Sequence, residues 1–175
     1  MENAKNIRHV YADNAATTAM STAALEKMIW ALENQYGIPS SLHTVGQEAK
    51  VYLEDARARV AKCLGAADPR GGIFTSGGSE SDNTAVRSAA YNGARKGRKH
   101  LISTAFEHHA ILHTLDALKK EGFVVTLLPV SPDGFVTAEQ VRDAIRPDTA
   151  LVSVMYANNE IGTVQPIREI GAVCR

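Results

Sequence analysis

The chain has 175 residues, 45% of them hydrophobic, and its 19 lysines and arginines are balanced by 19 aspartates and glutamates. This length allows one ordinary globular domain with a sizeable core, and the balanced charge does not favour binding to nucleic acid or to an anionic membrane. We find no apolar run that could span a bilayer, no secretory signal, and no disulfide framework or metal-binding spacing in Cys63 and Cys174. We therefore expect a cytoplasmic protein.

The first part of the chain is expected to be mainly helical. A short strand over 9–13 precedes a helix over 21–34, and a capping box made by Thr44 and Gln47 opens a second helix over 44–64. Apolar residues recur on one face of each helix. These are Leu25, Met28, Ile29 and Leu32 in the first, and Leu53, Ala56, Val60 and Leu64 in the second.

From residue 72 onward, strands and helices are expected to alternate. The expected strands cover 72–74, 99–104, 123–129 and 150–155, and the expected helices cover 79–94, 108–121, 137–145 and a segment from about 166. The second of these helices would turn Ile111, Leu115 and Leu118 inward, and a capping box made by Thr137 and Gln140 opens the third. Apolar strands that alternate with helices predict an α/β fold, with a mostly parallel sheet and helices on both faces.

The stretch 74–83 carries a local signal for anion binding. Gly77 and Gly78 follow an apolar run, and Ser79 opens a helix, so the backbone can approach an anion that faces the first N–H groups of that helix. Ser79 either donates its hydroxyl to that anion or caps the helix together with Asp82. A phosphate cradle and a plain capped turn are both open, whereas a P-loop is excluded because no Gly-Lys-Ser/Thr follows.

Other polar residues follow the later strands, and ligands of parallel sheets bind beyond the carboxyl ends of the strands. His108 follows one strand and Asn159 another, so a phosphate cradle, an imidazole and an amide are expected at one edge of the sheet. This combination suits a planar, phosphorylated, heteroaromatic ligand. His109 and His113 lie four residues apart, but Ala110 stands where a zinc-protease motif needs glutamate, so we expect surface histidines and no metal site.

Several longer segments occur in the order and spacing of a known family. These segments are 11–18, 36–43, 74–83, 107–110 and 157–166. The chain resembles the N-terminal part of the cysteine desulfurases of the nitrogen-fixation and iron–sulfur-cluster type. These are pyridoxal-phosphate enzymes of the class V aminotransferase family and belong to fold type I of the pyridoxal-phosphate enzymes. The resemblance implies that 1–20 form an N-terminal segment and that 21–175 form part of the large domain.

The resemblance also implies roles for four residues. Gly78 and Ser79 would hold the cofactor phosphate, and Ser79 keeps the hydroxyl of the threonine that the family usually has there. His108 would stack on the pyridine ring and assist proton transfer. Asn159 would bond the ring hydroxyl oxygen near the substrate carboxylate. Ile38 departs from the asparagine that the family usually has in the turn over 37–41.

The implied activity converts L-cysteine to L-alanine and leaves a persulfide on the enzyme, whose sulfur passes to scaffold or acceptor proteins for iron–sulfur cluster assembly. In this family the lysine that forms a Schiff base with the cofactor, the aspartate at the ring nitrogen and the nucleophilic cysteine would all come after Arg175. We therefore expect the 175-residue chain to be inactive alone, and we expect a homodimer. Alternatives are a selenocysteine lyase or another class V member, and a non-catalytic or split subunit that binds a complementary chain.

Overall fold

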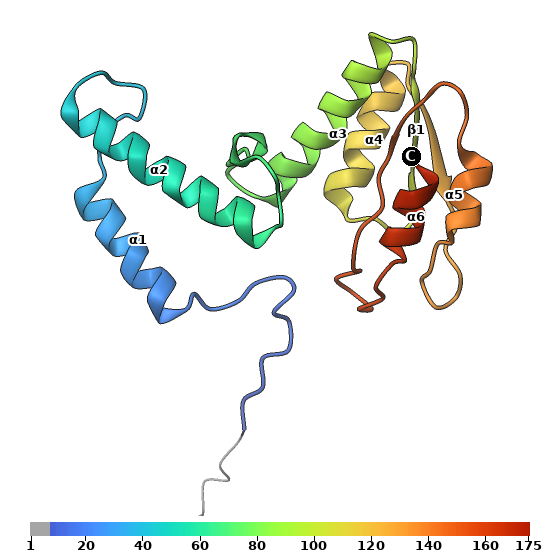
Figure 1. Cartoon of the computed structure of the whole chain (residues 1–175). Coiled ribbons are helices and arrows are strands. Elements are labelled where there is room, and N and C mark those ends of the chain that lie inside the picture. The colour runs from blue at the N-terminus through green and yellow to red at the C-terminus, as the bar shows by residue number, and fades with distance from the viewer. Residues whose placement is uncertain (1–7) are drawn as a thin grey trace, which may run out of the picture. The chain divides into compact units, whose positions relative to one another are not determined.

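The computed structural model describes residues 8–175, which divide into two compact units (Figure 1). We call the part up to Phe74 the helical unit and the part from Thr75 the sheet unit. The division that the family resemblance implies between residues 20 and 21 stays a prediction.

Over residues 8–74, the helical unit contains two α-helices and a short 3-10 helix. The bounds are Thr22–Asn34 for α1, Thr44–Cys63 for α2 and Pro69–Gly71 for η1. Ser21 caps α1, because its hydroxyl accepts a hydrogen bond from the Ala24 N–H at 3.3 Å. The rings of Trp30 and Tyr52 pack between α1 and α2 with their centroids 5.3 Å apart.

Three sequence predictions for the helical unit are wrong. The capping box at Thr44 is absent, because Nδ1 of His43 accepts from the Gly46 N–H and makes His43 the cap of α2. The strands expected over 9–13 and 72–74 do not form, because no strand among the described residues of this unit offers a partner. The Phe74 ring instead lies 4.9 Å from the Arg57 guanidinium.

The apolar faces predicted for α1 and α2 are only partly covered. No residue of α1 is buried, and the side chains of Leu25 and Met28 are 46% and 49% exposed. The buried residues of α2 are small: Gly46, Ala49 and Ala61.

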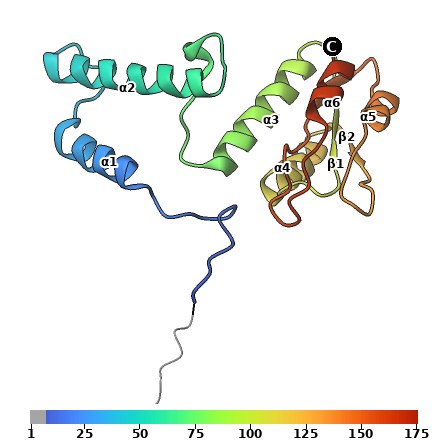
Figure 2. The same ribbon diagram turned by 60° about the horizontal axis from the view of Figure 1, so that its bottom comes forward.

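The sheet unit contains a three-stranded parallel sheet between two pairs of helices (Figure 1; Figure 2). The strands are β1 (His100–Thr104), β2 (Val124–Leu128) and β3 (Thr149–Val152), and the helices are α3 (Gly78–Ala94), α4 (His109–Lys120), α5 (Ala138–Ala144) and α6 (Ile167–Val173). β1 is central, with β2 and β3 parallel to it on either side. The expected α/β fold with helices on both faces is therefore confirmed.

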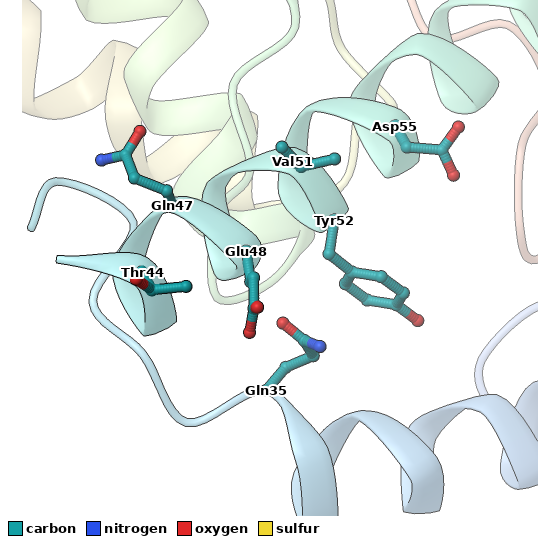
Figure 3. Close-up of a pocket in the computed structure, with 7 residues that line it drawn as sticks. All are labelled: Gln35, Thr44, Gln47, Glu48, Val51, Tyr52 and Asp55. Carbon is teal, nitrogen blue, oxygen red and sulfur yellow. The ribbon is translucent and has the colours of Figure 1, made fainter. Parts of the chain in front are cut away.

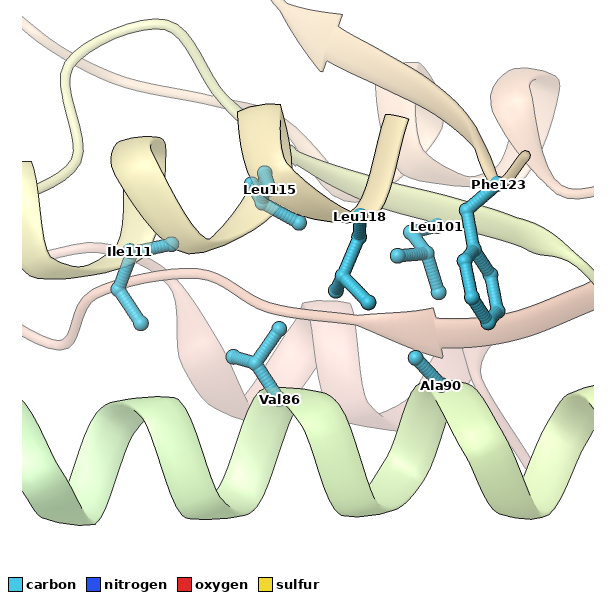
Figure 4. Close-up of a cluster of buried hydrophobic side chains, with 7 residues drawn as sticks. All are labelled: Val86, Ala90, Leu101, Ile111, Leu115, Leu118 and Phe123. Carbon is cyan, nitrogen blue, oxygen red and sulfur yellow. The ribbon is translucent and has the colours of Figure 1, made fainter. Parts of the chain in front are cut away.

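Successive residues of β1 point into two separate cores. Leu101 packs against α3 and α4, in the cluster that Figure 4 shows with Val86, Ala90, Ile111, Leu115, Leu118 and Phe123. Ile102 points to the opposite face, where it packs with Leu128, Val136, Val141 and Ile170. The inward residues predicted for α4 are thus buried, and the capping box of Thr137 and Gln140 is also present. These cores fix where α3 and α4 begin, at the edge of the sheet where β1 ends.

Candidate functional site

The turn before α3 presents backbone N–H groups to its surroundings. α3 begins at Gly78 with Gly77 as its N-cap, no side chain caps it, and its first backbone bond runs from the Ser81 N–H to the Gly77 carbonyl. The N–H groups of the first three helical residues therefore have no partner within the helix. Of the two roles left open for Ser79, the capping box with Asp82 does not form, because the helix starts one residue earlier than expected. Ser79 thus keeps a free hydroxyl at the second helical position.

The backbone conformation at Gly77 and Gly78 does not require glycine. Gly77 is extended, with φ 171° and ψ 176°, which any residue can adopt, and Gly78 is already helical. A Cβ on either glycine would meet nothing within 4 Å. The space in front of the turn is therefore open, and the missing side chains allow a ligand to approach the backbone closely.

The charge around the turn also fits an anion. The N-terminus of α3 carries the positive end of the helix dipole. Glu80 places a carboxylate in the first turn, but Oε2 is bonded by the Ser76 N–H at 2.6 Å and by the Ser76 hydroxyl at 2.7 Å, which lowers the pKa of Glu80. The Glu80 carboxylate is thus held by Ser76, in the segment before the helix. The N–H groups and hydroxyl of the Gly77–Ser79 turn fit a phosphate group.

A polar groove of about 390 Å³ lies between α3 and α4 and includes Ser79 and His108 in its lining. Nδ1 of His108 accepts from the Ala110 N–H at 3.1 Å, so His108 is the N-cap of α4. Because Nδ1 is an acceptor, Nε2 is the nitrogen that carries the proton of the neutral ring. The groove's remaining lining residues are Asn83, Arg87, His109, Ala110, His113 and Thr114. Two of the residues predicted for the site therefore share one groove.

The two neighbouring asparagines after β3 differ in their surroundings. Asn158 is buried: its Nδ2 donates to the Phe106 carbonyl at 3.3 Å, and its Oδ1 accepts from the N–H groups of Glu160 and Ile161. Asn159 is exposed, and its Nδ2 donates to Oε1 of Glu160 at 3.0 Å. Asn159 does not line the groove described above, but its amide is accessible to a ligand. Its role stays a prediction.

Glu107 is a residue of this region to which the sequence pattern assigned no role. Its side chain is 7% exposed, and Oε1 accepts from the Met155 N–H at 2.7 Å and from the Thr104 hydroxyl at 3.0 Å. Burial raises the pKa of this carboxyl, the two hydrogen bonds oppose the rise, and the charge of Asp82 adds to it. From sequence, only the position of an acid three residues after the end of a buried strand could have singled it out.

The helical unit also has a pocket, which does not contain the predicted cofactor-binding residues. Its volume is about 490 Å³, and none of the predicted site residues lines it. Figure 3 shows its lining residues: Gln35, Thr44, Gln47, Glu48, Val51, Tyr52 and Asp55.

Residues 8–175 contain neither a cluster of metal-binding side chains nor a helix that could span a membrane. No group of three or more His, Cys, Asp or Glu side chains is placed to hold a metal ion, and the rings of His109 and His113 stack with their centroids 5.5 Å apart. Among the helices of this described part, none is long and apolar enough to cross a membrane.

The chain is similar to known proteins along nearly its whole length. The family model described as aminotransferase class-V matches residues 10–175. The cysteine desulfurase IscS of Clostridium botulinum is 49% identical over 168 residues, which are 96% of this chain and 42% of that protein. The mitochondrial cysteine desulfurase of Saccharomyces cerevisiae is 46% identical over 169 residues, which are 96% of this chain and 34% of that protein.

Solved structures agree with the sequence comparison. A NifS-like protein superposes with a TM-score of 0.87 at 39% identity, covering 92% of this chain and 44% of that chain. A structure described as SspA in complex with cysteine gives a TM-score of 0.86 at 38% identity, covering 93% and 46%. The chain therefore spans less than half the length of the relatives it matches.

Proposed function

The chain belongs to the aminotransferase class-V family, and we propose that it supplies the phosphate-binding and ring-binding part of a cysteine desulfurase. Cysteine desulfurases of this family depend on pyridoxal phosphate. We also propose that residues 21–175 belong to the large domain of that enzyme.

The observation that carries this proposal is the shared groove of Ser79 and His108 beside two unobstructed glycines. The backbone N–H groups of Gly78 and Ser79, with the Ser79 hydroxyl, would bind the cofactor phosphate. The His108 ring would lie against the pyridine ring. The exposed Asn159 amide would donate to the ring hydroxyl oxygen and so orient the ring.

Pyridoxal phosphate, when bound, supplies the electron sink that this reaction needs. The contribution of this chain is binding, orientation and proton transfer. The helix dipole of α3 favours the phosphate. His108 holds a proton at Nε2, because its Nδ1 is bonded by the Ala110 N–H, and this N–H can donate a hydrogen bond to a group above the ring. Transfer of that proton requires Nδ1 to be protonated first, which breaks the bond from the Ala110 N–H.

For the whole protein we propose that the substrate is L-cysteine, in line with a structural neighbour described as a complex with cysteine. The products are L-alanine and an enzyme-bound persulfide. The sulfur then passes to acceptor or scaffold proteins for iron–sulfur cluster assembly. We further propose that the protein is a cytoplasmic homodimer.

The proposal is tested by titrating the purified chain with pyridoxal phosphate and measuring the dissociation constant by calorimetry. Ser79→Ala removes one donor to a charged group and should raise the dissociation constant about tenfold. Ser88→Ala, an exposed serine later on the same helix, should leave it unchanged. A wild-type chain that binds no pyridoxal phosphate, or an equal effect of both substitutions, would refute the proposal.

A further inference from the structure

The carboxyl of Glu107 is buried although no cation pairs with it. The described residues contain six ion pairs, and Glu107 takes part in none of them. A buried carboxyl without a cation lowers stability unless its hydrogen bonds compensate. Glu107 has two such bonds, both to Oε1. These two bonds therefore accommodate the buried carboxyl, and the groups that donate them show which segments it joins.

The hydrogen bonds of Glu107 join two segments that follow different strands. Thr104 is the last residue of β1, and Met155 lies three residues beyond the end of β3 at Val152. Glu107 accepts from both, at 3.0 Å and 2.7 Å. The turn over 105–108, which we call the His108 turn, is thereby tied to the loop over 155–159, which we call the Asn159 loop.

A second hydrogen bond ties the same two segments. Nδ2 of the buried Asn158 donates to the Phe106 carbonyl at 3.3 Å. The His108 turn and the Asn159 loop are thus joined by two hydrogen bonds, one at Glu107 and one at Phe106 directly before it. The groups that are proposed to contact the cofactor ring, the His108 imidazole and the Asn159 amide, stand at the ends of these fastened segments.

We propose that Glu107 is a positioning residue, which holds His108 and Asn159 at the separation that the ring of bound pyridoxal phosphate requires. This inference rests on the proposed function. Glu107 acts through the backbone of the His108 turn and through the Met155 N–H, and it does not line the groove. The phosphate-binding turn at Gly77–Ser79 belongs to another element, α3, and Glu107 makes no hydrogen bond to it. Glu107 should therefore matter for the ring and not for the phosphate.

The test compares pyridoxal phosphate with inorganic phosphate as ligands of the purified chain. Glu107→Ala should raise the dissociation constant for pyridoxal phosphate about tenfold, because it leaves the Met155 N–H unpaired and releases the His108 turn. The affinity for inorganic phosphate should not change. Glu107→Gln should restore most of the binding, since its amide oxygen can accept both hydrogen bonds. Glu139→Ala, which removes an exposed carboxyl from α5, should change neither affinity.

Amide hydrogen exchange at Met155 measures the hydrogen bond between its N–H and Glu107 without any ligand. Glu107→Ala should speed this exchange about tenfold, because the N–H loses its acceptor. Glu107→Met, which has a side chain of similar length without an acceptor, gives the same expected results if the alanine variant does not fold.

Three outcomes would overturn the positioning role alone. They are an unchanged affinity of Glu107→Ala for pyridoxal phosphate, an equal loss of affinity for both ligands, and an unchanged exchange rate at Met155. A wild-type chain that binds neither ligand is a different outcome: it refutes the proposed function, and the positioning role falls with it.

Discussion

Substitution of Gly78 by alanine should separate the stability of the fold from ligand binding. Gly78 is the first residue of α3, and a Cβ there meets nothing within 4 Å. Alanine reduces the conformational freedom of the unfolded chain, so the free energy of unfolding should rise by about 0.5 kcal/mol. For a unit of about a hundred residues this raises the melting temperature by roughly 2–4 °C.

The same methyl group should weaken anion binding. It would occupy open space beside the turn, where the phosphate is proposed to bind. A hydrogen bond to a charged group contributes about 1.5–3 kcal/mol, so the loss of one such contact should raise the dissociation constant for phosphate at least about tenfold. Stability and affinity should therefore change in opposite directions.

Thermal unfolding followed by circular dichroism, and phosphate titration followed by calorimetry, measure the two effects. Gly171→Ala is the matched control, because Gly171 also lies in a helix, α6, where a Cβ meets nothing within 4 Å. It should leave phosphate affinity unchanged. Phosphate binding by Gly78→Ala as tight as that of the wild type, or an equal loss of affinity in Gly171→Ala, would show that Gly78 does not contact the phosphate.

Three further predictions concern the polar groups of the sheet unit. Asn158→Ala should lower the free energy of unfolding by about 2 kcal/mol, because it removes a buried side chain that bonds the Phe106 carbonyl and the N–H groups of Glu160 and Ile161. Asn159→Ala should leave the free energy of unfolding in chemical denaturation unchanged but weaken pyridoxal phosphate binding, and equal stabilities of the two variants would contradict this distinction. Burial lowers the pKa of His100, so the folded state binds fewer protons than the unfolded state, and the free energy of unfolding measured with urea should fall as the pH drops below the ordinary pKa of 6.5. His100→Gln should weaken this pH dependence, and an unchanged pH dependence in that variant would rule out His100 as its source. Burial raises the pKa of Glu107, so the folded state keeps this proton to a higher pH and the free energy of unfolding should fall as the pH rises above the ordinary pKa of 4.5. Glu107→Gln should become more stable relative to the wild type over that range, and a difference in stability that does not change with pH would show that this carboxyl does not titrate as described.

The elements that the sequence predicted well are those whose signals are local. The three strands of the sheet are apolar runs bounded by turn residues, and the structure has them at nearly the predicted positions. The buried face of α4 follows from the spacing of Ile111, Leu115 and Leu118. The run over 72–74 is equally apolar, but a strand needs a hydrogen-bonded neighbour, which local sequence does not reveal.

The caps and the site depend on geometry that spacing cannot supply. Thr44 and Ser79 each stand at a capping spacing, yet His43 supplies the acceptor in one case and Glu80 reaches back to Ser76 in the other. The role of Glu107 depends on a partner 48 residues away in the sequence, Met155. Motif order could indicate which residues belong to the site, but not which of them are buried.

We propose that this chain binds pyridoxal phosphate with its phosphate at the Gly77–Ser79 turn and its ring at His108. The most direct test is to titrate the isotope-labelled chain with pyridoxal phosphate and follow backbone amide and histidine ring signals by NMR. We predict that the largest and saturable shifts occur at Gly78, Ser79 and the His108 ring, and that inorganic phosphate shifts only the two amides. Shifts confined to other residues, or scattered over surface lysines without saturation, would contradict the account.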